Sequence, residues 1–229
     1  MDWVQWHDRY DASPALIARL RTVRAHITRC LDAFPPGVIR VLSICAGDGR
    51  DVIPVLSAYR RVQDVRARLI EMDTRLVEHG RAMAEAAGLA DTIDFVAGDA
   101  TAVAAYGDLA PADLVLACGV FGNVRKADTA RLVESLASLC ARDGFLIWTR
   151  RIGGGFRRGY AQQTPGAYGA DPAAILALLR TRSFEDVQVE HLADARFVVS
   201  TCRHRGEAPP LPSDNRPLFV FTGATGPPA

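Results

Sequence analysis

The stretch Val38–Asp51 reads VIRVLSICAGDGRD, and it predicts how the rest of the chain is organised. An apolar, β-branched run ends at Ile44 and is followed by small residues that include two glycines, Gly47 and Gly49. Helix-compatible sequence then continues from 50 to 59. A strand, a glycine turn and a helix in this order present backbone N–H groups and the positive end of the helix to a ligand. Glycine suits such a turn because it has no side chain to hold the ligand away and tolerates positive φ.

Strands and helices alternate along the sequence that follows. Further buried strands are predicted at 67–72, 92–96, 113–118 and 145–149, and helices at 51–59, 74–87 and 126–141. Before the first strand, Ser13 and Pro14 start a helix that runs to about residue 33. A helix at 171–181 and short strands at 187–191, 196–202 and 218–221 come last, the final two being antiparallel. This alternation predicts an α/β fold with a doubly wound, mostly parallel sheet and helices on both faces.

The length of 229 residues suits one well-buried domain, which we expect to span 1–229. Within it we distinguish an N-terminal cap segment and helix (1–35), a ligand-binding core (36–150) and a C-terminal part (151–229). The C-terminal part holds a glycine-rich loop at 153–170, then a helix and the last strands. A loop of that length in a compact domain is usually functional or disordered, so we interpret it as a lid.

Composition limits the partners. The net charge of +1 gives no electrostatic argument for nucleic acid or a membrane surface. The five cysteines are odd in number and scattered, which indicates reduced thiols in a cytoplasm, and no Cys/His spacing suggests a metal. No segment approaches the ~18 apolar residues of a membrane span, and Met1-Asp2-Trp3 does not begin a signal peptide. We therefore expect a cytoplasmic monomer or homodimer that binds neither nucleic acid nor membrane.

The glycine turn resembles the first motif of the class I S-adenosylmethionine (SAM)-dependent methyltransferases, a pattern like VLDLGCGTG. The corresponding residues here are VLSICAGDG (41–49), where Ser43 stands in place of the usual acid and Cys45 replaces the first glycine. Three more pieces follow in order: RLIEMD (68–73), FVAGDA (95–100) and DLVLACGVFGN (113–123). The resemblance covers 38–149, about half the chain. It implies a Rossmann-like, seven-stranded sheet with an antiparallel C-terminal strand, an N-terminal helical cap, and SAM as cofactor with S-adenosylhomocysteine (SAH) as product.

The resemblance also implies that the cofactor lies across the ends of the first four strands. Asp73 would accept hydrogen bonds from two ribose hydroxyls, because a carboxylate only accepts, and Glu71 is its rival for that role. Asp99 would meet the adenine amino group. The full set of predicted cofactor-binding residues is Cys45, Ala46, Gly47, Asp48, Gly49, Asp51, Met72, Asp73, Gly98, Asp99, Ala100, Cys118, Gly119 and Val120.

Methyl transfer asks the protein to hold a nucleophile in line with the methyl group, to exclude water and, for some substrates, to supply a base. His7 is the candidate catalytic base, and a surface histidine is its alternative. Asn123 would orient a polar substrate group, or else cap the helix near Lys126. The predicted substrate contacts are Trp6, Tyr10, Phe121 and Arg150. Arg150 would hold an acidic group or lie in a solvated loop, and the N-terminal aromatics would either cover the site or pin the terminus.

The sequence excludes some activities. The fourth strand is not followed by the N-P-P-Y type tetrapeptide of amide and adenine methylation, and no G-x-S-x-G elbow of a serine hydrolase is present. These absences and the balanced charge favour a small-molecule acceptor with an O-, N- or C-nucleophile. Two alternatives stay open: a non-catalytic SAM- or ligand-binding protein, and an NAD-dependent oxidoreductase. Val52 speaks against the oxidoreductase, because the dinucleotide fingerprint has glycine or alanine there.

Overall fold

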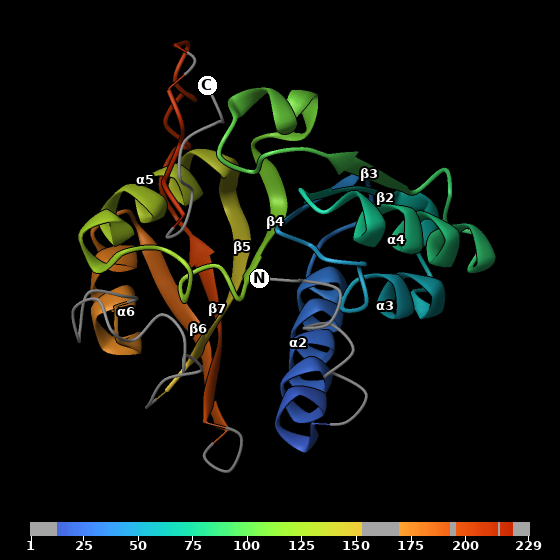
Figure 1. The fold of residues 1–229 in the computed structure, drawn as a ribbon, viewed down its shortest axis with the longest axis horizontal. Helices are drawn as coiled ribbons and strands as arrows, with labels where there is room; N and C mark the ends of the chain where they lie inside the picture. Colours follow the sequence, from blue (N-terminus) through green and yellow to red (C-terminus); the bar gives the residue numbers. More distant parts are fainter. Residues whose placement is uncertain (1–12, 153–169, 193–195, 215, 222–229) are drawn as a thin grey trace.

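The computed structural model describes residues 13–152, 170–192, 196–214 and 216–221 (Figure 1). In this part of the chain one seven-stranded sheet has the order β3-β2-β1-β4-β5-β7-β6. Its strands are β1 (Ile39–Ile44), β2 (Val65–Glu71), β3 (Ile93–Ala97), β4 (Ala112–Cys118), β5 (Cys140–Arg151), β6 (Phe184–Leu192) and β7 (Phe197–His204). Neighbours from β3 to β5 are parallel, and β7 runs antiparallel to both β5 and β6. The direction of winding changes between β1 and β4, the place where doubly wound sheets bind their ligands.

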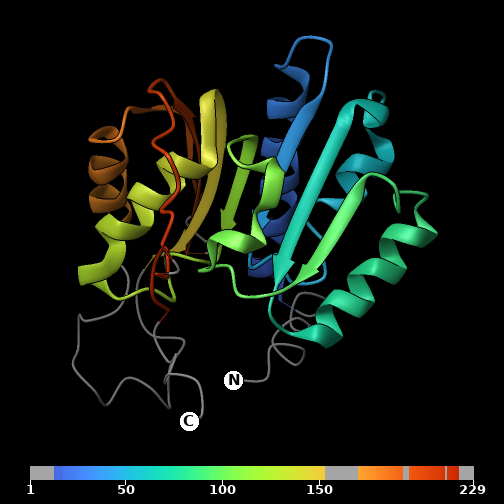
Figure 2. The ribbon, with the colours of Figure 1, turned by 90° about the horizontal axis from the view of Figure 1, so that it is seen from above.

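Helices cover both faces of the sheet (Figure 2). The helices are α2 (Pro14–Asp32), α3 (Ile53–Ala58), α4 (Thr74–Ala86), α5 (Thr129–Leu139) and α6 (Pro172–Arg180). One buried cluster joins α2, α3 and α4 to the strand face that carries Val41, and a second joins α5 and α6 to the face that carries Leu42. Because successive strand residues point to opposite faces, an apolar run such as that of β1 fills both clusters. The doubly wound fold predicted from the sequence is confirmed.

Local signals for helix starts and stops are also confirmed. Ser13 caps α2 by accepting a hydrogen bond from the Leu16 N–H at 3.5 Å, and proline follows at the first helical position. Pro54 lies in the first turn of α3, where its missing N–H costs nothing. Gly88, just beyond α4, has φ +71°, the left-handed conformation that favours glycine at a helix end.

One predicted strand boundary and one predicted strand were wrong. Strand β5 begins at Cys140 rather than 145, because Cys140 already pairs with Ala112 and the register then shifts to absorb Asp143, whose φ is +61°. Residues 218–221 form no strand of the sheet. The Leu218 N–H donates to the Thr101 carbonyl at 2.7 Å, and only Phe221 forms an isolated bridge. The antiparallel hairpin is instead β6–β7.

Helix α2 packs lengthwise on one face of the sheet, and a buried histidine fastens it there. His26 Nδ1 lies 2.6 Å from Thr201 Oγ1 on β7, and Nε2 lies 3.0 Å from Glu190 Oε1 on β6. Glu190 also faces Arg29, one turn further along the helix. The cap segment that precedes α2, residues 1–12, lies outside the described residues.

We expect the stability contribution of His26 to depend on pH. Burial lowers the pKa of His26, and the hydrogen bond to Glu190 opposes this shift less strongly. The folded state therefore favours the neutral imidazole, and its contribution is full above about pH 6.5 and is lost as the pH falls below it. Thermal melts at pH 7.5 and 5.5 should show His26→Gln less stable than the wild type at the higher pH, with a smaller gap at the lower. A gap that stays constant would contradict this assignment.

Gly80 lets α4 approach the glycine turn closely. A Cβ at Gly80 would collide with the Phe95 ring and lie 2.9 Å from the Asp48 carbonyl oxygen. Overpacking of this kind costs about 1–3 kcal/mol, more than the roughly 1 kcal/mol that alanine gains in a helix. We expect Gly80→Ala to lower the free energy of unfolding in urea, whereas Glu78→Ala, on the exposed side of the same helix, should leave it nearly unchanged. A Gly80→Ala protein as stable as the wild type would mean that the helix can move away at no cost.

Candidate cofactor and acceptor site

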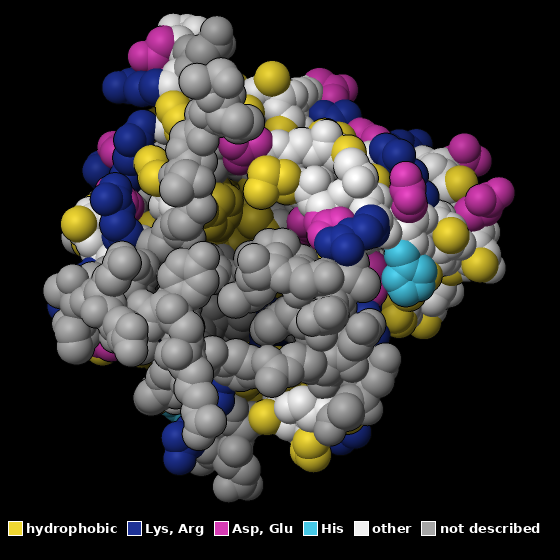
Figure 3. Space-filling model, viewed as in Figure 1, with side chains coloured by type: hydrophobic (Ala, Val, Ile, Leu, Met, Phe, Trp, Pro, Cys, Tyr) yellow, Lys and Arg dark blue, Asp and Glu magenta, His cyan; other side chains and the backbone are white. Residues whose placement is uncertain are grey.

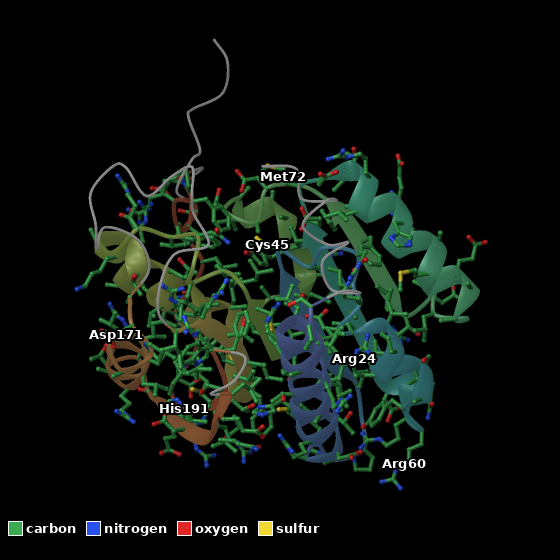
Figure 4. All side chains as sticks on the ribbon, turned by 60° about the horizontal axis from the view of Figure 1, so that its bottom comes forward. Arg24, Cys45, Arg60, Met72, Asp171 and His191 are labelled. Carbon is green, nitrogen blue, oxygen red and sulfur yellow. The ribbon has the colours of Figure 1, made fainter. Side chains whose placement is uncertain are left out.

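The ends of β1, β2 and β3 are joined by hydrogen bonds at one edge of the sheet. The Ala46 N–H donates to the Ile70 carbonyl at 2.9 Å, and the Gly98 N–H donates to the Glu71 carbonyl at 2.9 Å. The Gly47 N–H donates to Glu71 Oε2 at 3.0 Å. Cys45 and Met72 lie near each other at this edge, far from Arg60 (Figure 4). The predicted convergence of these strand ends is therefore present.

The turn after β1 has a backbone that mostly requires glycine. Gly47 has φ +61° and Gly49 φ +73°. A Cβ at Gly49 would lie 2.8 Å from Leu69 Cδ2 and 2.9 Å from Phe95 Cζ, so a side chain has no room there. Cys45 has φ +54° although it is not glycine, a conformation that costs an L-residue roughly 1–2 kcal/mol. Cys45 therefore adopts the left-handed conformation that glycine would adopt at less cost.

The acid at the end of β2 is Glu71, which corrects the prediction that Asp73 ends this strand. Asp73 is the N-cap of α4, where its carboxylate accepts hydrogen bonds from the Arg75 backbone N–H and the Arg75 side chain. These bonds, the side-chain bond first, lower the pKa of Asp73. Glu71 instead reaches across to the glycine turn. The two acids are only two residues apart. Glu71 is the last residue of β2 and pairs with Ala97, whereas Asp73 lies beyond the strand as the N-cap of α4.

The ends of β2 and β3 are open to solvent. Met72 is 68% exposed, and the Asp99 side chain is exposed while its Oδ1 accepts from the Thr101 N–H at 2.8 Å. Ala100 is buried, and its carbonyl accepts from the Tyr106 hydroxyl at 2.5 Å. In Figure 3 hydrophobic side chains lie in a hollow near the middle of the view, where Figure 1 shows β4 and β5, and charged side chains lie beside it.

The two aspartates of the glycine turn have different environments. Asp48 is buried, and its Oδ2 lies 2.6 Å from Arg50 Nη2. Asp51 is 9% exposed, and its Oδ1 has no hydrogen-bond partner in the described part of the chain. Burial raises the pKa of Asp51, and the nearby charge of Arg19 opposes this shift. A buried carboxylate oxygen without a donor is rare in a folded protein and indicates a missing partner.

Arg19 was missed by the sequence analysis. It is 6% exposed, its guanidinium lies 5.8 Å from the Phe197 ring, and one of its nitrogens is 4.0 Å from where a Gly119 Cβ would be. The available signal was its position, since Arg19 occurs between Leu16 and Val23 on the apolar face of α2. A charged residue on such a face needs a specific partner or ligand.

The turn after β4 is rigidly held. The Gly119 N–H donates to Thr149 Oγ1 at 2.9 Å, and Asn123 Nδ2 donates to the Gly119 carbonyl at 2.9 Å. Asn123 therefore braces this turn and is not the cap of α5, whose N-cap is Asp128. Burial raises the pKa of the Cys118 thiol to about 12, so this sulfur is neutral near pH 7.

The predicted substrate contacts have different outcomes. The Phe121 side chain is 1% exposed and packs against Trp148 with ring centroids 5.4 Å apart, so it faces the core instead of the site. The Val120 side chain is buried in the same cluster. Arg150 does lie at this edge, at the end of β5. Trp6, His7 and Tyr10 lie outside the described residues, as does most of the 153–170 loop.

The described residues include neither a candidate metal site nor a candidate membrane-spanning helix. They contain no group of three or more His, Cys, Asp or Glu side chains arranged to hold a metal ion. None of the helices they form has the length and apolar character that crossing a membrane demands.

Comparison with known proteins decides the family. Residues 20–152, more than half of the chain, match a family model described as "Putative methyltransferase". The chain belongs to this methyltransferase family. The search of curated proteins found no match. The resemblance to class I SAM-dependent methyltransferases is thus confirmed by the family model, and it agrees with the strand order of the sheet.

Solved structures show the same fold. CurJ carbon methyltransferase is 14% identical with a TM-score of 0.71, covering 90% of this chain and 59% of that one. Magnesium protoporphyrin IX methyltransferase (ChlM) from Synechocystis PCC 6803 with bound SAH is 15% identical with a TM-score of 0.66, covering 88% of this methyltransferase and 94% of ChlM. An O-methyltransferase family protein from Burkholderia thailandensis is 12% identical with a TM-score of 0.62, and the match covers 86% of this chain and 59% of that protein. The chain thus spans only 59% of the length of the first and third of these proteins.

Proposed function

We propose that this methyltransferase transfers the methyl group of SAM to a small-molecule acceptor. The observation that carries the proposal is that hydrogen bonds join the ends of β1, β2 and β3, with β4 paired to β1 next to them. The buried Oδ1 of Asp51, after β1, has no partner among the described residues. ChlM, which shares the fold, has a structure with bound SAH.

The residues at the site fit the parts of SAM. Glu71 offers carboxylate oxygens for the ribose hydroxyls, and Asp99 offers an acceptor for the adenine amino group. Gly47, with φ +61°, turns the chain after β1 and has no side chain to hold a cofactor away from the backbone. Asp51 and Arg19 bring an anion and a cation to the same place, which matches the α-ammonium and α-carboxylate of the amino-acid end.

The chemical demand on the protein is small. SAM supplies a methyl group that is already activated by its attachment to a positively charged sulfur. The protein must therefore bind the cofactor and the acceptor, orient them for in-line transfer, and exclude water. The hydrogen bonds of Gly119 and Asn123 hold the turn after β4 in place for this purpose. The neutral Cys118 thiol does not supply a base near pH 7. His7 stays the predicted base.

Binding and turnover test this proposal separately. We expect SAM and SAH to raise the melting temperature and NAD to leave it unchanged. A ligand at a hundred times its Kd increases the free energy of unfolding by about 2.7 kcal/mol. A shift with NAD alone would overturn the cofactor assignment. Methyl transfer from labelled SAM across phenols, amines and carboxylates then tests catalysis. SAM binding with no transfer to any acceptor would favour the non-catalytic alternative.

A further inference from the structure

Arg150 is placed next to the turn that follows β4. Thr149, the residue before it, pairs with Cys118 of β4 and accepts the Gly119 N–H at 2.9 Å. On the same turn, a Cβ at Gly122 would lie 3.4 Å from Arg150 Nη1, which places the guanidinium in contact distance of this turn. Arg150 therefore belongs to the same edge of the sheet as the cofactor-binding turn.

Two nitrogens of the Arg150 guanidinium have no partner among the described residues. Its Nε donates to the Ala170 carbonyl at 3.1 Å, and in the described residues no hydrogen bond or ion pair involves Nη1 or Nη2. The side chain is half-buried. Burial lowers the pKa of Arg150, and Asp171 is the one acid that opposes this shift. Arginine nevertheless stays charged, so a cation is held at the edge of the site with two donor nitrogens that no carboxylate of the described residues pairs with.

The order of the strands places Arg150 on the acceptor side. This step depends on the proposed function, in which the cofactor lies over the ends of β3, β2, β1 and β4. In-line displacement requires the nucleophile to approach the methyl group from the side opposite the sulfur. The next strand beyond β4 is β5. An acceptor that reaches the methyl group from beyond β4 therefore passes the end of β5, where Arg150 lies.

We propose that the methyl acceptor carries an anionic group, a carboxylate or a phosphate, which Arg150 holds through Nη1 and Nη2. Two parallel N–H donors of one planar guanidinium match the two oxygens of such a group and fix its orientation as well as its position. The bond from Nε to Ala170 fixes the guanidinium in place and uses only one of its five N–H donors. Arg150 is thus a positioning residue that selects acidic acceptors.

Small probes that differ in charge test this inference without knowledge of the natural acceptor. Benzoate, phenyl phosphate and uncharged benzamide are titrated by NMR into the SAH complex of the wild type, Arg150→Gln, Arg150→Lys and the control Arg142→Gln. Arg142 is exposed and pairs with Glu207 on the surface. We expect benzoate or phenyl phosphate to bind the wild type at least about tenfold more tightly than benzamide, an effect of the size expected for a charge-assisted pair. Which of the two anions binds better distinguishes a carboxylate acceptor from a phosphate acceptor.

The variants show whether Arg150 causes the preference for anionic probes over benzamide. Arg150→Gln should lose the preference for the anions, Arg150→Lys should keep part of it, and Arg142→Gln should keep all of it. The inference is overturned if benzamide binds the wild type as well as the anions do, or if Arg150→Gln keeps the preference. Binding of SAH itself is measured first in every variant and should not change. A wild type that fails to bind SAH refutes the proposed function instead, so the two failures are distinguishable.

Discussion

Replacement of Asp51 by asparagine is expected to weaken SAH binding about 10- to 100-fold and to leave the affinity for 5′-methylthioadenosine unchanged. The two ligands share the adenosine and the sulfur, but methylthioadenosine lacks the amino-acid end. Asp51 has a buried oxygen without a donor, and Arg19 lies close enough to oppose the effect of burial on its pKa. A hydrogen bond from an ammonium group to this oxygen is charge-assisted, and its loss corresponds to about 1.5–3 kcal/mol. Isothermal titration calorimetry with both ligands measures the difference directly.

The stability of the ligand-free protein shows whether Asp51 serves ligand binding or the stability of the fold. Burial raises the pKa of Asp51, so the folded state favours the protonated acid, and any stability this gives is lost as the pH rises through the folded pKa. At pH 7 the ionised carboxylate is therefore not a source of stability. We expect ligand-free Asp51→Asn to melt no lower than the wild type at that pH.

A neighbouring acid provides the control for Asp51. Asp48 is paired with Arg50 inside the turn, so Asp48→Asn should change the affinities for SAH and methylthioadenosine by the same factor. If Asp51→Asn weakened both ligands equally, Asp51 would be a structural residue of the turn, and the amino-acid end would bind elsewhere.

Replacement of Glu71 by glutamine should weaken SAH and methylthioadenosine alike, by about tenfold or more. Both ligands carry the ribose diol, and a carboxylate accepts from two hydroxyls where an amide offers one acceptor and unwanted donors. Glu71 is held over the glycine turn by the Gly47 N–H. The contrast with Asp51 is informative because one substitution should affect both ligands and the other only SAH.

The matched control is Asp73, two residues further along. Asp73→Ala removes the N-cap of α4, which typically costs about 1 kcal/mol of stability, and should leave the affinity for SAH unchanged. Urea unfolding and calorimetry on the same two variants give four values that test the assignment. If Asp73→Ala weakened SAH binding more than Glu71→Gln did, Asp73 would be the residue that binds the ribose, as the sequence predicted.

The sequence by itself determined the class of the fold and which strand ends form the candidate site. Strand, glycine turn and helix over 38–51, the Ser13-Pro14 helix start and the Gly88 helix end all depend on local backbone chemistry, which a short stretch specifies completely. The alternation of such units leaves few topologies. That is why the parallel sheet and the carboxyl ends of its first four strands could be predicted.

Only the tertiary structure decided which partners the candidate side chains have. Glu71 and Asp73 are equally plausible locally, yet Glu71 accepts a hydrogen bond from the glycine turn whereas Asp73 caps α4. Phe121 follows a strand end as a ligand contact would, yet its ring packs on Trp148 from β5. Arg19 and Asp51 are 32 residues apart and meet because α2 packs on the same face as the helix after the glycine turn. Contacts between distant segments follow from packing, and no local pattern encodes them.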